Sequence, residues 1–254
     1  ANPGAGIFNN VEIEIGGQRI DRQTGQWMHI WASLTEENSA RVVSDTVGAG
    51  GTLFQELTCM GGTSSAANAA LNVKVPLQFW FCRNPGLALP LIALQYHEVK
   101  VVTTFSSQTM TTPAAKLWAD YIYLDTDERR RFAQVSHEYL IEQVQHQAGS
   151  VASPTTELNF NHPVKELIWA SAWDDGEMAS LGDGAEYQLK LNGHDRMAAR
   201  PLEYFTKQQV YMHHTGPGSL GVVAASSEGH GNSGDAIAVY SFALKPEEHQ
   251  PSGT

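Results

Sequence analysis

Three groups of residues in this chain have types and spacing that could support chemistry. The first is the stretch 229–234, GHGNSG, which matches the glycine pattern G-x-G-x-x-G of dinucleotide-binding sites. That fingerprint works only where a strand precedes it and a helix follows, because the helix N-terminus then receives the pyrophosphate. Here the glycines lie within a loop and lead into an apolar strand. No nucleotide cofactor is therefore predicted.

The second group consists of histidines. His137 and Glu138 begin like the zinc motif H-E-x-x-H, but Ile141 occupies the position of the second ligand. The other histidines that loops could bring together show no ligand spacing: His213, His214, His230 and His249. The sequence therefore predicts no metal site.

The third group is a pair of carboxylates. Glu12 and Glu14 share one face of an alternating strand, about 6.6–6.8 Å apart along the chain. Retaining glycosidases hold their two carboxyl groups about 5–5.5 Å apart, so a hydrolase remains an alternative. A solvated strand face is the favoured interpretation, because carboxylates that alternate along a strand nearly always face solvent. With no G-x-S-x-G motif present, no catalytic residue is predicted, and binding or assembly is favoured.

Composition narrows the class of partner. The 254 residues carry a formal net charge of −11, with 42% hydrophobic and 17% charged residues. The only basic cluster, Arg129–Arg131, follows three acidic residues, so direct nucleic-acid binding is not expected. No apolar run reaches the roughly 18–20 residues of a membrane-spanning helix. The two cysteines, Cys59 and Cys82, are expected to be reduced, with Cys82 buried in a strand.

The elements that would position these groups are organised around residues 73–102. Two apolar strands are predicted there, Val75–Phe81 and Leu89–Val101, joined by a turn at 83–86 that contains Pro85 and Gly86. Strict alternation predicts a strand at 11–15, ended by a turn at Gly16 and Gly17. The spacing of Trp27, Ile30, Trp31 and Leu34 predicts a short amphipathic helix. Strands are expected at 52–60 and 119–124. Asp125 is expected to cap a helix, and 139–145 could be a helix or a strand.

The small polar stretch 147–156 predicts a linker. Beyond it, the expected elements are strands at 158–160, 164–173, 187–191 and 236–244, an Asn192-Gly193 turn, and an ambiguous segment at 204–211. Short strands between Gly, Pro and Ser loops predict an all-β fold, either β-sandwich or jelly roll, with a few short helices in loops, and the linker predicts two such domains in series. The first domain would span 1–146 and the second 157–254.

Five blocks of sequence resemble one protein family in the family's own order. They are IEIGGQRIDRQTGQWMHIW (13–31), PLQFWFCRNPGLALPLIALQYHEVKV (76–101), ADYIYLDTDERRRFAQVSHEYLIEQVQ (119–145), LNFNHPVKELIW (158–169) and YSFALKPEEHQPSGT (240–254). The chain is thereby similar to the major capsid proteins of nucleocytoplasmic large DNA viruses, of the algal-virus and iridovirus kind.

The resemblance implies a structural protein with no cofactor, located in the virion and assembled in the host cytoplasm. Three chains would form a pseudo-hexagonal capsomer that tiles an icosahedral shell, in contact with neighbouring capsomers and minor capsid proteins and close to an internal viral membrane, without direct contact to nucleic acid. The resemblance also implies two consecutive jelly-roll β-sandwiches of eight strands each, a double jelly roll, and these need more strands than this sequence predicts. The opening strands of the first roll and the closing strands of the second are therefore expected to be missing.

Two alternatives stay open on the residues alone. The first is a carbohydrate-binding jelly roll that uses exposed aromatic residues such as Trp173, Tyr204 and Tyr211, or a platform formed by Trp27 and Trp31. The second is a jelly-roll glycosidase that uses Glu12 and Glu14.

Overall fold

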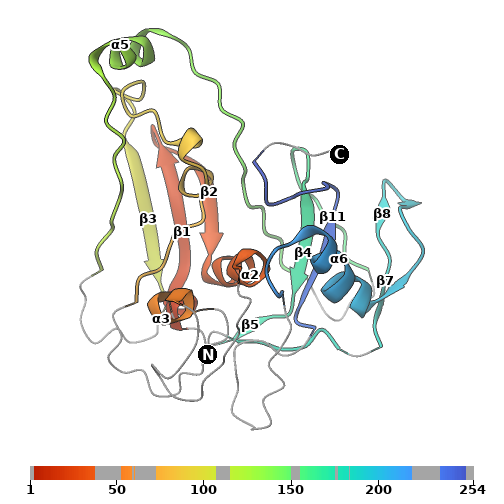
Figure 1. Ribbon diagram of the computed structural model, residues 1–254. Coiled ribbons are helices and arrows are strands. Elements are labelled where there is room, and N and C mark those ends of the chain that lie inside the picture. Colours follow the sequence, from red (N-terminus) through yellow and green to blue (C-terminus); the bar gives the residue numbers. More distant parts are fainter. Residues whose placement is uncertain are drawn as a thin grey trace. The chain divides into compact units, whose positions relative to one another are not determined.

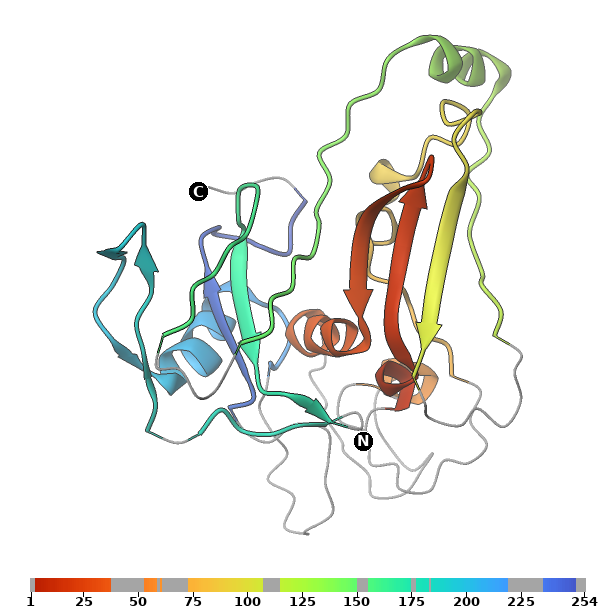
Figure 2. The ribbon, with the colours of Figure 1, turned by 180° about the vertical axis from the view of Figure 1, so that it is seen from behind.

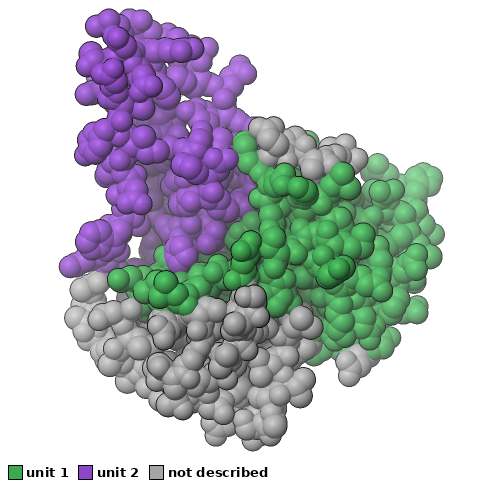
Figure 3. All heavy atoms as spheres, in the orientation of Figure 1, with its two compact units in different colours: residues 1–6, 25–75, 147–254 green, residues 7–24, 76–146 purple. Residues whose placement is uncertain are grey.

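The computed structural model describes residues 3–37, 53–58, 60, 73–106, 115–149, 155–174, 177–182, 184–218 and 235–249. The chain divides into two compact units (Figure 3). Unit 2 comprises 7–24 and 76–146, and unit 1 comprises 1–6, 25–75 and 147–254. Unit 2 thus ends where the predicted linker begins, although 25–75 belongs to unit 1. The assignment of one jelly roll to 1–146 and another to 157–254 stays a prediction.

Unit 2 is built on one antiparallel sheet with the strand order β2-β1-β3 (Figures 1 and 2). Its elements are β1 (Phe8–Ile15), β2 (Gln18–Thr24), α4 (Trp80–Arg83), the 3-10 turn η1 (Pro85–Leu87), β3 (Val99–Phe105) and α5 (Thr126–Gln134).

The central strand β1 follows the alternation of its sequence. Val11 and Ile13 are buried, whereas Glu12 and Glu14 lie on the opposite face and keep part of their surface in solvent. The turn to β2 uses Gly16 at φ 60° and Gly17 at φ 81°, a region that glycine enters without a Cβ clash. The predicted strand and turn are confirmed.

The predicted hairpin of two strands, 75–81 and 89–101, is wrong. Only the turn between them and the last residues, 99–101, agree with the prediction. Residues 80–83 form the helical turn α4, and a strand begins only at Val99. Local bonds replace a ladder: the Asn84 side chain accepts from Gly86 N at 2.9 Å, and Ala93 N donates to Pro90 O at 2.9 Å. Cys82 was predicted to be buried in a strand. It lies instead in α4 and is exposed.

A buried carboxylate fixes the chain that follows α5. Asp21 of β2 is 4% exposed, and its Oδ1 accepts from the backbone N–H groups of Arg22 at 2.9 Å and Val144 at 3.0 Å. Its Oδ2 accepts from Gln23 Nε2 at 3.1 Å. The Gln143 side chain adds a bond to Ile20 O at 2.5 Å. Residues 139–145 are therefore bound to β2 through side chains and form neither the predicted helix nor the predicted strand.

Of two further expectations for unit 2, one is confirmed and the other is wrong. The helix capped by Asp125 is confirmed, because the Asp125 carboxylate accepts from Thr126 N at 2.5 Å and α5 follows. The strand predicted at 119–124 is not formed: these residues are exposed, have no regular secondary structure, and belong to none of the sheets of the described chain.

Unit 1 carries small antiparallel pairs and most of the helices. Its elements are α1 (Pro3–Gly6), α2 (Gly25–Thr35), α3 (Leu53–Thr58), β4 (Glu166–Ala170), β5 (Trp173–Asp174), β6 (Glu177–Met178), β7 (Glu186–Tyr187), β8 (Lys190–Leu191), β9 (His194–Asp195), β10 (Arg200–Pro201), the π-helical turn η2 (Tyr204–Gln208), α6 (Gln209–His213) and β11 (Ile237–Ser241). The strands pair as β4 with β11, β5 with β6, β7 with β10, and β8 with β9.

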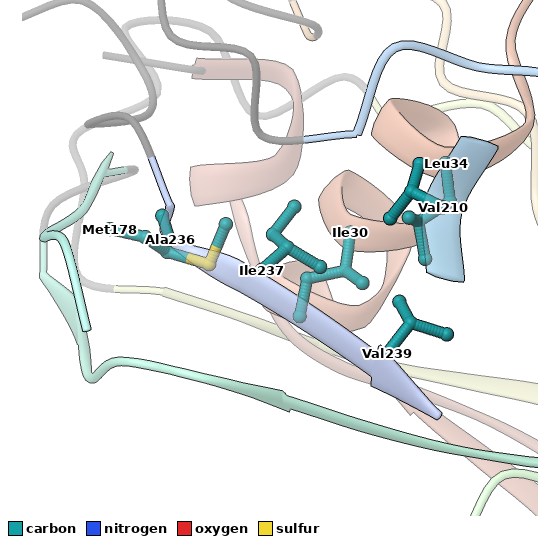
Figure 4. Close-up of a cluster of buried hydrophobic side chains, with 7 residues drawn as sticks. All are labelled: Ile30, Leu34, Met178, Val210, Ala236, Ile237 and Val239. Carbon is teal, nitrogen blue, oxygen red and sulfur yellow. The ribbon is translucent and has the colours of Figure 1, made fainter. Parts of the chain in front are cut away.

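The core of unit 1 lies where α2 and α6 pack on β11 (Figure 4). α2 contributes Ile30 and Leu34, α6 contributes Val210, and β11 contributes Ile237 and Val239. The i, i+4 spacing of the α2 residues places them on one helical face, as the sequence predicts. Trp31 is also buried, which leaves it no free face for stacking on a sugar.

The remaining expectations for unit 1 are mixed. The Asn192-Gly193 turn joins β8 to β9 with φ of 51° and 79°, and β11 lies inside the predicted strand 236–244. β4 and β5 lie inside the range predicted as one strand at 164–173, apart from the last residue of β5. Residues 204–211 are helical. The strand at 158–160 is absent, and the one at 52–60 is the helix α3, in which Thr58 Oγ1 donates to Phe54 O at 2.8 Å.

Within the described residues, no helix combines the length and the apolar character that crossing a membrane requires.

Truncation of Leu34, which is 0% exposed, is expected to destabilise unit 1 because it leaves a cavity between α2 and α6. We expect Leu34→Ala to lower the free energy of unfolding by about 2–5 kcal/mol in urea titrations. The matched control is Leu244→Ala at a residue that is 70% exposed, where a change within about 0.5 kcal/mol is expected. Equal losses in the two variants would contradict this assignment of the core.

Removal of the Asp21 carboxylate is expected to release residues 143–145 from β2. Asp21→Ala leaves the backbone N–H groups of Arg22 and Val144 without the carboxylate that accepts from them, at a cost of about 1–3 kcal/mol. Hydrogen exchange of the Val144 amide should accelerate. Asp120→Ala removes an exposed aspartate of the same unit and should leave this amide unchanged. An unchanged Val144 rate in Asp21→Ala would refute the anchoring role.

Candidate functional site

The carboxylate pair predicted on β1 is an ion-paired strand face. Glu12 Oε1 lies 3.3 Å from Arg19 Nη1 and 3.3 Å from Arg22 Nε on the neighbouring strand β2. In the β1–β2 register, Arg22 is opposite Glu12 and Arg19 is opposite Glu14. Cross-strand charge pairs of this kind stabilise a sheet. Glu12 is thus held in ion pairs with two arginines of β2.

Of the other two motifs noted in the sequence, the structure describes only the one at His137. His137 caps the end of α5: its Nε2 lies 2.8 Å from Phe132 O, and its ring stacks on the Phe132 ring with centroids 4.8 Å apart. The glycine-rich stretch 229–234 lies outside the described residues. Among the residues that the structure does describe, no three His, Cys, Asp or Glu side chains are arranged to hold a metal ion.

One buried polar centre does form, around His214 in unit 1. The side chain of His214, immediately after α6, is 0% exposed. Its Nε2 lies 3.0 Å from Glu166 Oε2, at the start of β4, and its Nδ1 lies 3.0 Å from Glu247 Oε1, in the turn 245–248. The Trp31 ring of α2 lies perpendicular to the imidazole, with centroids 6.5 Å apart. We call His214, Glu166 and Glu247 the His214 centre.

The two carboxylates decide the charge of this centre. Burial by itself would lower the pKa of His214, but the hydrogen bonds that its ring donates to Glu166 and Glu247, together with the negative charges of these groups, raise it to about 9. Burial alone would raise the pKa of Glu247. The hydrogen bonds that His214 and Thr215 donate to this carboxylate outweigh the effect of burial and hold its pKa below its usual range. The imidazole is therefore charged at neutral pH.

Sequence reasoning noted His214 only as one of several scattered histidines. Its partners Glu166 and Glu247 lie 48 and 33 residues away along the chain. No periodicity connects such positions, so no local signal could have found the centre.

An exposed apolar stretch is the second unusual feature, here called the 117–123 segment. Its large side chains face solvent: Leu117 (66% exposed), Trp118 (86%), Tyr121 (67%), Ile122 (61%) and Tyr123 (93%). Single exposed apolar residues are ordinary, whereas a contiguous group marks a surface that binds something. The segment has no regular secondary structure and lies in no sheet of the described chain. It is the strongest candidate for an assembly surface.

Comparison with known proteins identifies the family. The sequence matches the family model described as Major capsid protein N-terminus over residues 2–125, and the one described as Large eukaryotic DNA virus major capsid protein over 128–178. It is 33% identical to the major capsid protein of Phaeocystis pouchetii virus, over 99% of this chain and 72% of that protein. The chain belongs to the family of large eukaryotic DNA virus major capsid proteins.

Further relatives of this capsid-protein family extend the likeness. The major capsid protein of Pyramimonas orientalis virus is 49% identical, over 98% of this chain and 65% of that protein, so the chain spans about two thirds of its length. A solved structure described as the PBCV-1 virus capsid, quasi-atomic model, matches with a TM-score of 0.68 and 32% identity, over 100% of this chain and 68% of that one.

The exposed fractions of two tryptophan side chains of unit 2 predict different effects of their truncation on the free energy of unfolding. Trp118→Ala, at a side chain that is 86% exposed, should change the free energy of unfolding by no more than about 0.5 kcal/mol. Trp80→Ala, at a side chain that is 5% exposed, should cost about 3–5 kcal/mol. Chemical denaturation of both variants measures the difference. A large loss in Trp118→Ala would mean that the 117–123 segment is part of the core of the chain.

Proposed function

We propose that this chain is a structural subunit of a virus shell, which self-assembles with copies of itself and has no catalytic role. The observation that carries the proposal is the likeness to major capsid proteins, which extends over almost the whole chain at up to 49% identity. The exposed apolar side chains of the 117–123 segment support it, because a subunit that assembles must keep apolar surface available for a neighbour.

We infer that the small sheets belong to a double jelly roll, one roll on each side of the linker 147–156. The strand pairs of both units and the TM-score of 0.68 against a virus capsid structure support this inference. Three such chains would form the pseudo-hexagonal capsomer, with neighbouring capsomers and minor capsid proteins as partners. Assembly in the host cytoplasm, next to an internal viral membrane, belongs to the same proposal.

The sugar-binding alternative finds no support in Tyr204 or Tyr211, two of the aromatic residues that suggested it; the side chain of Trp173, the third, lies outside the described part of the structure. The Tyr204 ring packs against Phe205 with centroids 5.0 Å apart and receives the Arg200 guanidinium at 5.5 Å, so this ring is already engaged. Tyr211 is 88% exposed, but no ring-stacking partner recorded in the described structure joins it in a platform.

The solution mass of the purified chain tests the shell proposal. Light scattering coupled to size exclusion should give three times the mass of one chain, and negative-stain images of the same peak should show a hexagonal outline. Adding salt should not dissociate the trimer if apolar contacts hold it, because screening weakens only charged contacts. A monodisperse monomer that persists at high protein concentration would contradict self-assembly.

A further inference from the structure

Four segments of unit 1 that are far apart in the sequence meet at the His214 centre. The end of α2, the start of β4, residues 214–216 and the turn 245–248 each contribute one contact or more. Thr215 extends the contact: its N–H donates to Glu247 Oε1 at 3.0 Å, and its Oγ1 lies 2.9 Å from Glu247 Oε2. Gly216 N donates to Leu34 O, at the end of α2, at 2.7 Å.

The geometry at the ring suits an imidazole that carries a proton on each nitrogen, between two ionised carboxylates. Each ring nitrogen of His214 faces a different carboxylate at 3.0 Å, and a carboxylate can only accept. A neutral imidazole has one N–H and one lone pair, so one of the two carboxylates would face a lone pair at hydrogen-bond distance. Only the charged imidazolium donates to both. Because the side chain is 0% exposed, water has no access with which to replace a lost bond.

We propose that the His214 centre is a proton-operated clamp: the charged ring holds residues 214–216 and the turn 245–248 on β4, and loss of one ring proton releases them. Release would be local. β11 keeps its ladder to β4, from Ile237 opposite Ala170 to Ser241 opposite Glu166, whatever the charge of the ring. The clamp therefore controls the turn beyond β11 and the residues after α6 without unfolding the sheet.

The charged groups around the clamp are few. β4 supplies Glu166 and the turn supplies Glu247, whereas α2 contributes the uncharged ring of Trp31. The neighbouring histidine, His213, is bonded through Nδ1 to Leu244 O at 3.0 Å. Lys245 pairs with Glu248 at 2.9 Å, on the exposed side of the turn. Lys165, immediately before Glu166, donates from Nζ to Glu248 O at 2.5 Å, so among the described contacts this cation bonds to the backbone of the turn and not to the ring.

The direction of the pH effect follows from the raised pKa. A histidine whose pKa rises from 6.5 in the unfolded chain to about 9 in the folded one stabilises the fold fully below about pH 6.5. The stabilisation falls progressively above that and is gone once the pH exceeds about 9. Each unit of pKa difference is a tenfold change in the folding equilibrium. The clamp should therefore open on the alkaline side.

Nuclear magnetic resonance of the histidine rings in the full 254-residue chain tests the clamp directly. With ¹⁵N-labelled histidine, the His214 ring should carry protons on both nitrogens at pH 7 and lose one with a midpoint near 9. The signal is assigned by its disappearance in His214→Gln. A singly protonated His214 ring at pH 7 would overturn the proposal.

Two matched variants separate the clamp from a general effect of charge. Glu247→Gln removes a carboxylate that faces the ring and should lower the His214 midpoint by at least one pH unit. Glu248→Gln makes the same change one residue further on, at a side chain that is 58% exposed and turned to Lys245, and should leave the midpoint in place. Equal shifts in the two variants would overturn the assignment. If Glu247→Gln does not fold, the titration of the unmodified chain still decides.

Hydrogen exchange shows whether titration releases the turn. After correction for the intrinsic pH dependence of exchange, amides of 244–249 should exchange at least tenfold faster above the His214 midpoint than below it. The amides of β11 should keep their protection. In Glu247→Gln, the onset of fast exchange in 244–249 should move to lower pH together with the His214 midpoint. Exchange in 244–249 that does not follow the ring titration would reduce the centre to a static ion pair and refute the clamp.

Discussion

Asp21 illustrates the constraint on which both units depend: a polar group removed from water must find another partner. Residues 139–145 make no strand ladder with β2, and the Asp21 carboxylate accepts the Val144 N–H in its place. His214 of unit 1 is a second example, because its two buried ring nitrogens bind carboxylates from β4 and from the turn 245–248. Buried side chains thus fix irregular segments that the small sheets leave without a ladder.

Local patterns predicted the elements that depend on local interactions. The alternation of β1, the Gly16-Gly17 turn, the apolar stripe of α2 and the Asp125 cap of α5 can all be read within a few residues. The segments 75–81, 89–98 and 119–124 fit strands equally well by composition. Whether such a segment becomes a strand depends on a distant partner for its backbone, and a short window of sequence does not contain that partner.

The His214 centre and the 117–123 segment also differ in how much of each can be read from the sequence. The His214 centre joins positions up to 48 residues apart and leaves no periodic signal. The apolar character of the 117–123 segment is plain in the sequence, but its exposure is not, since apolar residues usually indicate burial. The family, by contrast, was accessible from the sequence, because five blocks in a fixed order are specific where single motifs are not.

The central claim is that this capsid-family chain assembles through apolar surface that is exposed in the isolated subunit. Hydrogen exchange of the 117–123 segment in the isolated and the assembled protein tests it most directly. We expect rapid exchange in the isolated chain, where the segment belongs to no sheet of the described residues, and strong protection after assembly. Equal rates in the two states would show that assembly uses another surface and would contradict the claim.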